Sequence, residues 1–201
     1  MKKTVLILLV ILLNTVFLSA KTTYLTPSKA NKIQEIINEA ASGDKIILKK
    51  GTYYLKKPIR ISGKSSLTIL ARGRVQLRTK YKYAGIISIS GSQKVSLVNL
   101  HLRHRMRSSK GSTAACIFIR KSSRIRIKGC IINRSPAYGI RTSRASDIII
   151  INCKISNCAR SAFQLTSTSR MQILKNILFK NKKTLVTVKA DFVMEGNSVK
   201  N

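Results

Sequence analysis

An internal repeat constrains the fold of this chain more than any other feature of its sequence. Successive copies of a unit of about 23 residues begin at Arg124, Asp147, Arg170 and Asp191. In each copy the second, fourth and ninth residues are apolar, and the sixth or seventh is small or polar. A repeat of this length indicates a solenoid, in which each unit buries its apolar residues against the next. The apolar set comprises Ile125, Ile127, Ile132, Ile148, Ile150, Ile155, Met171, Ile173, Leu178, Phe192, Met194 and Val199.

Each unit is predicted to contain three short strands. Apolar residues alternate with polar ones along the first strand, and the small residue after it turns the chain into the second. A leucine-rich repeat needs Leu-x-x-Leu-x-Leu spacing, and a propeller blade needs about 40 residues, so neither fits. The sequence therefore predicts an all-β parallel β-helix. Inward positions of the third strand are Ile117, Ile119, Ile140, Thr142, Phe163 and Leu165.

Residues 1–20 have the pattern of a secretory signal peptide. Lys2 and Lys3 precede the apolar run Val5–Leu13, and Leu18-Ser19-Ala20 supplies a cleavage site. The apolar run is shorter than a membrane-spanning helix. We therefore expect a secreted or periplasmic protein with one domain over residues 21–201.

The start of that domain carries a family resemblance. Residues 31–41 are predicted to form an amphipathic helix, which Ser42-Gly43 ends, and a strand and Gly51-Thr52-Tyr53 follow. This order resembles the N-terminal cap and first coil of the pectin lyase-like superfamily. The resemblance implies a single-stranded right-handed parallel β-helix with repeats over about 45–201 and a short capping α-helix. It leaves activity open, because the same cap precedes lyases, hydrolases and proteins of other roles.

The charge balance points to a polyanionic partner. The chain has 39 Lys and Arg against six Asp and Glu, giving a formal net charge of +33. Such a field attracts polyanions, although basic residues also serve simply to solubilise an exposed sheet. Export would exclude nucleic acid as the physiological partner. We expect an acidic polysaccharide or another polyanion.

The family's carboxylate-based chemistry has no counterpart here. Resemblance to pectate lyases would imply calcium on clustered carboxylates, and resemblance to polygalacturonases would imply paired carboxylates, but the six acids are scattered. Only Arg126-Ile127-Lys128 matches a polygalacturonase motif. We therefore predict neither a metal nor a cofactor. A lyase of the alginate and chondroitin type would instead use basic residues about one coil apart, such as Arg103 with Arg126 or Arg120 with Arg141.

The predicted site is a basic track along the third strands. Arg120 and Arg141 occupy outward positions there, and His104 is expected to open a long loop over residues 103–115. Neighbouring arginines lower the pKa of a histidine, which favours a base near neutral pH. His104 and Arg141 are the catalytic candidates, the alternative being that His101 and His104 are ordinary surface residues. The predicted binding residues are Arg103, Arg105, Arg107, Arg120 and Arg126.

Two further patterns concern packing. Cys130 and Cys153 share one inward position on adjacent coils, which allows either a disulfide or a ladder of free thiols. Outward apolar residues on the first two strands predict a face covered by loops or by another subunit. The short last copy leaves an apolar end, for which cover by a partner or second subunit, a shortened gene product and fraying of Val199 to Asn201 are the alternatives. The outward apolar residues are Ile131, Ile149, Ile151, Leu174 and Ile177.

Two functions compete on these grounds. One is a protein that binds an acidic polysaccharide or cleaves it by β-elimination. The other is a non-catalytic envelope or adhesion protein that binds polyanions through its basic face.

Overall fold

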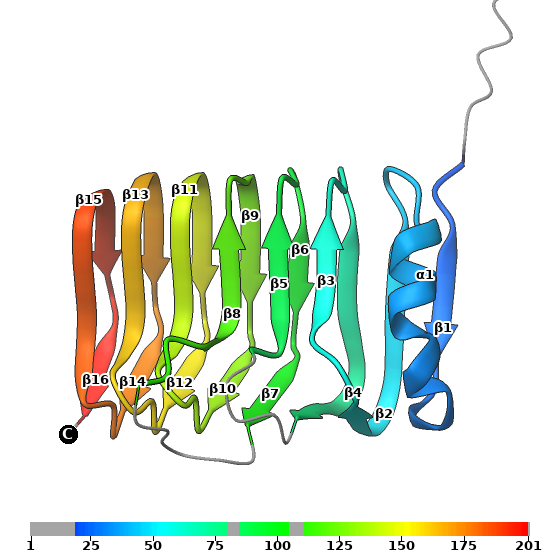
Figure 1. Ribbon diagram of the computed structural model, residues 1–201, viewed down its shortest axis with the longest axis horizontal. Coiled ribbons are helices and arrows are strands. Elements are labelled where there is room, and N and C mark those ends of the chain that lie inside the picture. The colour runs from blue at the N-terminus through cyan, green and yellow to red at the C-terminus, as the bar shows by residue number, and fades with distance from the viewer. Residues whose placement is uncertain (1–18, 80–84, 105–110, 201) are drawn as a thin grey trace, which may run out of the picture.

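Parallel strands wind into coils that stack along one axis (Figure 1). The computed structural model describes residues 19–79, 85–104 and 111–200. Every strand pairing within this part is parallel, as in β10 with β12 and β11 with β13. The predicted right-handed parallel β-helix with a short N-terminal helix is confirmed.

The strands form three faces, named here by their order within a coil. Five long strands bend at a corner and serve two faces each: β2 (Lys45–Leu55), β4 (Thr68–Thr79), β11 (Tyr138–Ile151), β13 (Ser161–Leu174) and β15 (Lys183–Glu195). The first face adds β6 (Ser96–Val98) and β9 (Ser123–Lys128), and β1 (Thr22–Leu25) pairs with β2. The second adds β7 (His101–His104), β10 (Ile131–Asn133), β12 (Lys154–Ser156), β14 (Ile177–Phe179) and β16 (Ser198–Lys200). The third adds β3 (Ile59–Ser62), β5 (Ile87–Ser90) and β8 (Ala115–Arg120).

Residues with a left-handed backbone conformation (positive φ) form the corners between the faces. Lys121, Gly129 and Arg134 have φ of 47°, 64° and 61° and lie at three successive corners of one coil. Each turns its backbone N–H along the axis, where it donates to the next coil at 3.0–3.1 Å, to Ser143, Ile151 and Ser156 respectively. A non-glycine residue in this conformation costs about 1–2 kcal/mol. The coil-to-coil hydrogen bonds offset that cost, because a buried backbone group without a partner is also costly.

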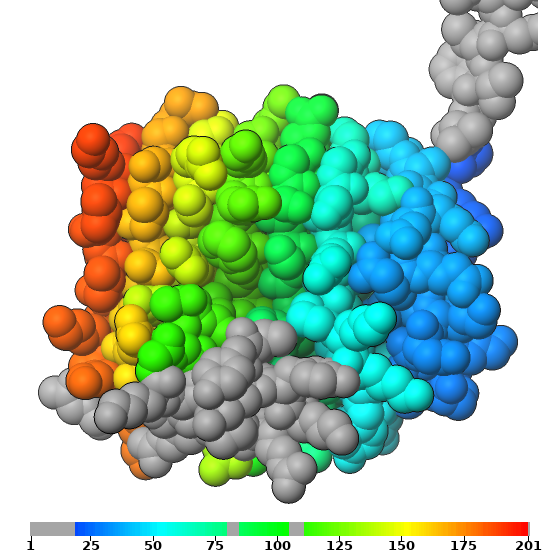
Figure 2. Space-filling model, viewed as in Figure 1, coloured from blue at the N-terminus to red at the C-terminus, as the bar shows by residue number. Residues whose placement is uncertain are grey.

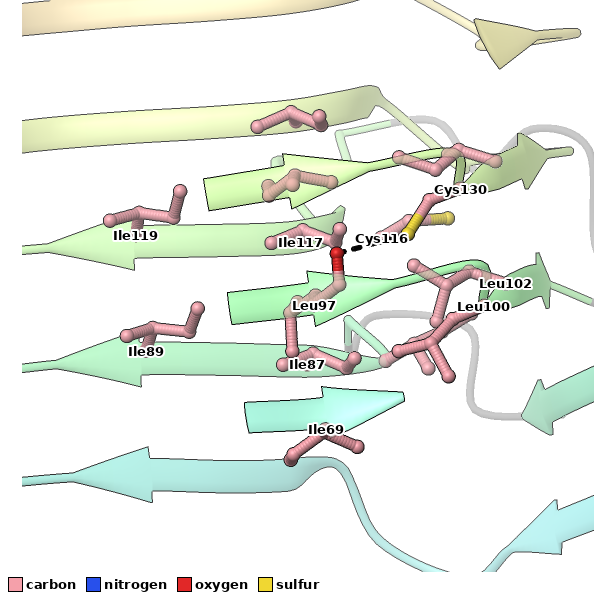
Figure 3. Close-up of a cluster of buried hydrophobic side chains, with 14 of the residues drawn as sticks. Ile69, Ile87, Ile89, Leu97, Leu100, Leu102, Cys116, Ile117, Ile119 and Cys130 are labelled. Carbon is pink, nitrogen blue, oxygen red and sulfur yellow. Dashed lines mark hydrogen bonds between the residues drawn. The ribbon is translucent and has the colours of Figure 1, made fainter. Parts of the chain in front are cut away.

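The interior is a set of ladders of like side chains. On the first face Leu97, Ile127, Ile150 and Ile173 stand in register on successive coils, and all are fully buried. Figure 3 shows such rows, with Ile87, Ile89, Ile117 and Ile119 opposite Leu97 on the third face. The apolar residues of the first three predicted repeats are all buried. In the last copy Phe192 and Met194 are half-buried and Val199 is 53% exposed, because within the described residues β15 pairs with β13 alone and β16 with β14 alone.

Asparagine and cysteine share one inward column at the corner between the first and second faces. Asn176 and Asn197 continue the column that Cys130 and Cys153 begin, and their side chains bond the backbone of the preceding coil. All four cysteines are buried and free, so Cys130 and Cys153 form a ladder of thiols. Burial raises the pKa of Cys116 to about 12, which keeps that thiol protonated.

The N-terminal end is closed by α1 (Ile33–Glu39), which follows a 3₁₀ helix over Pro27–Lys32. The helix is shorter than the predicted 31–41, because Ala40 is already extended. Ile33 and Ile37 are buried against the first coils, and Lys64 donates to the carbonyls of Asn38 and Ala40 at 2.6 and 2.8 Å. The predicted signal peptide lies outside the described residues up to position 18. None of the helices in the described part is long and apolar enough to cross a membrane.

Candidate functional site

The outward side chains of the third face form two columns along the axis. One column runs Arg60, Ser88, Phe118, Arg141, Gln164 and Val186, and the other runs Ser62, Ser90, Arg120, Ser143, Thr166 and Val188. Neighbours within a column are about 4.8 Å apart. Figure 2 views this face, with successive coils in successive colours. The strand segments that form this face (59–62, 87–90, 115–120, 138–143, 161–166 and 183–188) contain no Asp or Glu.

Arg141 is a half-buried basic side chain of this face. Its Cζ lies 5.1 Å from the centre of the Phe118 ring, one coil away in register, in a cation–π contact. Its Nε is buried, as is Oε1 of Gln164 in the next coil, and among the described residues neither atom has a hydrogen-bond partner. Buried polar atoms are normally paired. Because Nε is inaccessible from outside, a bound hydroxyl or carboxylate would contact the exposed part of the half-buried Arg141 side chain.

Sequence reasoning missed Phe118. The signal was present, because Phe118 precedes Arg141 by one repeat length and lies between the inward residues Ile117 and Ile119. Aligning the outward positions as well as the inward ones would have placed the ring beneath the guanidinium.

Arg120 and Arg141 lie on this face on adjacent coils, but in different columns. Arg120 pairs with Ser143, and Arg141 pairs with Phe118, so the two arginines are diagonal neighbours. Arg120 is exposed and Arg141 is half-buried. The predicted basic track therefore contains both.

Arg103 and Arg126 do not belong to the track, so their predicted proximity is wrong. Arg103 lies in β7 on the second face and pairs with Arg78 and Asn133. Arg126 lies in β9 on the first face and pairs with Ser96 and Ile149. The chain remains in strand conformation through residue 104, which puts Arg103 before the loop. Arg105 and Arg107 lie outside the described residues.

His104 is an interior residue, and the expectation that it opens a surface loop is wrong. The alternation of β7 continues through it, so that Leu102 and His104 point inward and His101 and Arg103 point outward. Its side chain is 0% exposed. A side chain at this depth does not touch a ligand on the outer surface, which leaves Arg141 as the remaining catalytic candidate.

His101 gives the second face a pH dependence. Burial lowers its pKa from 6.5, and Arg103, Arg74 and Arg78 lower it further. The unfolded chain therefore takes up a proton before the folded protein does, and stability is expected to fall as the pH drops below about 6.5. Denaturant unfolding of wild type and His101→Gln between about pH 8 and pH 5 measures this. The variant should show a shallower pH slope, and an unchanged slope would rule out His101 as its source.

Within the described residues no three of His, Cys, Asp and Glu come close enough to hold a metal ion. Ile131 and Ile177 of the second face are 40% and 44% exposed, while Ile149, Ile151 and Leu174 of the first face are half-buried. A partner for this apolar surface remains a prediction.

Comparison with known proteins places the chain in a family. Residues 84–201 match the family described as a right handed beta helix region, which is more than half of the sequence. The chain belongs to this right-handed β-helix family. No curated protein sequence matches it.

Several solved structures share the fold of this right-handed β-helix. Polygalacturonase from Erwinia carotovora ssp. carotovora superposes with a TM-score of 0.73 at 12% identity, over 90% of this chain and 67% of its own. A Parabacteroides merdae ATCC 43184 protein, provisionally described as a glycosyl hydrolase, has a TM-score of 0.71 at 12% identity, over 88% and 91%. Pectate lyase Bsp165PelA from Bacillus sp. N165, solved with trigalacturonate, has a TM-score of 0.55 at 11% identity, over 92% and 83%. At these identities the likeness concerns the fold alone.

Proposed function

We propose that this protein is exported and binds an acidic polysaccharide on its third face. The observation that carries the proposal is Arg141 stacked on Phe118, with a buried guanidinium nitrogen that has no partner among the described residues. A guanidinium held in place by a ring loses little freedom when it binds a carboxylate, and it offers two parallel donors to that group. The ring adds an apolar platform beside it.

The surroundings favour an anionic sugar chain. Arg120 lies on the coil of Phe118 and Gln164 lies on the coil after Arg141, and Ser143 and Thr166 add hydroxyls. The strand segments that form the third face carry no carboxylate, so an anion bound on them meets no like charge there. The formal net charge of +33 attracts such a chain from a distance. The pectate lyase with the same fold was solved with trigalacturonate, an acidic oligosaccharide.

Binding by an envelope or adhesion protein and cleavage by β-elimination both begin from this complex. We assign the carboxylate to Arg141. A guanidinium bonded to a carboxylate stays protonated, so β-elimination would need a base other than Arg141. Ultraviolet absorbance of unsaturated uronates distinguishes the two outcomes on pectate, alginate, chondroitin and heparin. A rise that Arg141→Ala abolishes would establish a lyase, and a flat trace with retained binding would establish a binding protein.

The binding test compares two pairs of arginines. Arg120→Ala with Arg141→Ala should weaken binding of oligogalacturonate or a heparin oligosaccharide at least about tenfold, since each lost charged hydrogen bond is worth roughly 1.5–3 kcal/mol. The control, Arg72→Ala with Arg74→Ala, removes the same charge from an exposed corner away from the third face. Calorimetric titration at fixed salt gives both affinities. Equal losses in the two variants would mean that only the overall charge matters and would refute the site.

A further inference from the structure

A groove follows the corner between the third and first faces. It has a volume of about 550 Å³ and is lined by residues of five successive coils, from Gly63 to Ser169. At about 4.8 Å per coil its length is roughly 19 Å. It lies beyond the ends of the strand segments that form the third face, and neither Phe118 nor Arg141 lines it.

The groove exists because each corner begins and ends at a residue whose backbone has the left-handed conformation. In one coil these are Lys121 and Arg124, with φ of 47° and 55°, and in the next they are Arg144 and Asp147, with φ of 50° and 55°. Only two small residues lie between each pair. The first of the two points into the core, where Ser122 and Ala145 are buried.

In each coil, the second of the two residues between the left-handed positions forms the floor of the groove. These floor residues pair in register across five coils, which makes a continuous row of hydroxyl and amide groups parallel to the axis. The row is Ser65, Gln93, Ser123, Ser146 and Ser169. A row of this kind offers a donor or acceptor at every coil.

The edges of the groove are cationic. Lys121 and Arg144 line it, both are exposed, and within the described residues neither has an ion pair or a side-chain hydrogen bond. Lys64 also lines it, but its ammonium group is bound to the carbonyls at the end of α1. No lining residue is acidic. Asp147 lies just beyond, where it accepts from Ser146 at 3.0 Å and pairs with Arg170 at 2.6 and 2.8 Å.

We propose that this groove is a second binding surface, which holds an extended anionic polysaccharide parallel to the axis of the β-helix. Hydroxyls on the floor suit the hydroxyls of a sugar chain, and Lys121 and Arg144 suit its carboxylates or sulfates. Single-stranded nucleic acid would need aromatic side chains for base stacking, and the groove has none among its lining residues. A membrane surface would need exposed large apolar residues, which the lining also lacks.

The test uses variants that change charge and shape separately. Lys121→Ala with Arg144→Ala should weaken binding of an oligogalacturonate or a heparin oligosaccharide at least about tenfold. Ser146→Phe keeps the net charge but fills the floor, and we expect it to weaken binding by a similar factor. Asp147→Asn removes the nearby carboxylate, whose pKa of about 2 keeps it ionised at neutral pH, and should strengthen binding a few-fold. Asparagine also tolerates the left-handed backbone at this position.

The controls separate this surface from the third face. Arg72→Ala with Arg74→Ala gives the effect of charge alone, and thermal unfolding confirms that each variant is folded. If the groove variants lose affinity while the Arg120→Ala, Arg141→Ala double variant keeps it, the groove is supported and the third-face site is refuted. If the double variant loses affinity while the groove variants keep it, the groove is refuted. A Ser146→Phe variant that binds as wild type, or a single-stranded oligonucleotide that binds as tightly as the sugars, would also overturn the proposal.

Discussion

Replacing Ile127 with alanine is expected to lower the free energy of unfolding by about 2–5 kcal/mol. Ile127 is fully buried in the middle of the first-face ladder, with Leu97 on one coil and Ile150 on the other. Loss of the Ile127 side chain leaves a cavity between two coils. The backbone hydrogen bonds hold these coils at a fixed spacing, so the neighbouring groups cannot move in to fill the cavity. Because each coil contacts only its neighbours, the defect also weakens the link between the two halves of the stack.

Denaturant unfolding followed by circular dichroism measures this change. Ile127→Val removes one methylene and should cost about 0.5–1.5 kcal/mol, which gives a graded series. Lys128→Ala, in the same strand but exposed, is the matched control and should cost less than about 0.5 kcal/mol. An alanine variant at position 127 that unfolds like the control would show that the first-face ladder contributes little to stability.

Replacing Asn176 with alanine is expected to lower the free energy of unfolding by about 2–4 kcal/mol. Its Oδ1 accepts from the Cys153 N–H at 2.8 Å, and its Nδ2 donates to the Ile150 carbonyl at 3.0 Å and to Asn197 Oδ1 at 2.9 Å. The side chain is 1% exposed, so water does not replace these partners. Each orphaned buried group costs about 1–3 kcal/mol.

The comparison with Asn176→Asp tests the hydrogen-bond explanation. Aspartate keeps the acceptor for the Cys153 N–H but loses the donor to the Ile150 carbonyl, and it brings a carboxyl group into the interior. The Asn176→Asp protein should therefore be no more stable than the Asn176→Ala protein. Gln172→Ala, exposed near the end of β13 and four residues before Asn176, is the control. Hydrogen exchange should rise first at the Cys153 amide in the alanine variant. Unchanged exchange at that amide would contradict the role assigned to Asn176.

The binding predictions depend on where cations gather rather than on how many there are. A chain with a formal charge of +33 retains polyanions through many weak contacts. The third face and the corner groove differ from this background, because Arg141 is fixed by Phe118 and because the groove combines cations with a row of hydroxyls. Charge-matched controls and the neutral Ser146→Phe variant therefore carry the decisive information.

The sequence by itself determined the coil. The apolar positions of the repeat, the three strands in each unit and the inward cysteine column follow from spacing along the chain, and the structure confirms them at Ile127, Ile150 and Cys153. The reason is that strand alternation and repeat length are local properties, and the burial of one unit against the next depends only on them.

Only the tertiary structure decided which outward side chains meet. Arg103 and Arg126 are one repeat length apart in sequence, yet they lie on different faces, because the coil here is longer than the repeat: Arg103 pairs with Asn133 and Arg126 pairs with Ser96, each 30 residues away. His104 is buried because its strand continues further than the apolar spacing indicated. The pairing of Arg141 with Phe118 and the groove beside Lys121 and Arg144 depend on coil register and on left-handed corners formed by residues other than glycine. Those conformations are held by hydrogen bonds to the neighbouring coil, which exist only once the coils have stacked.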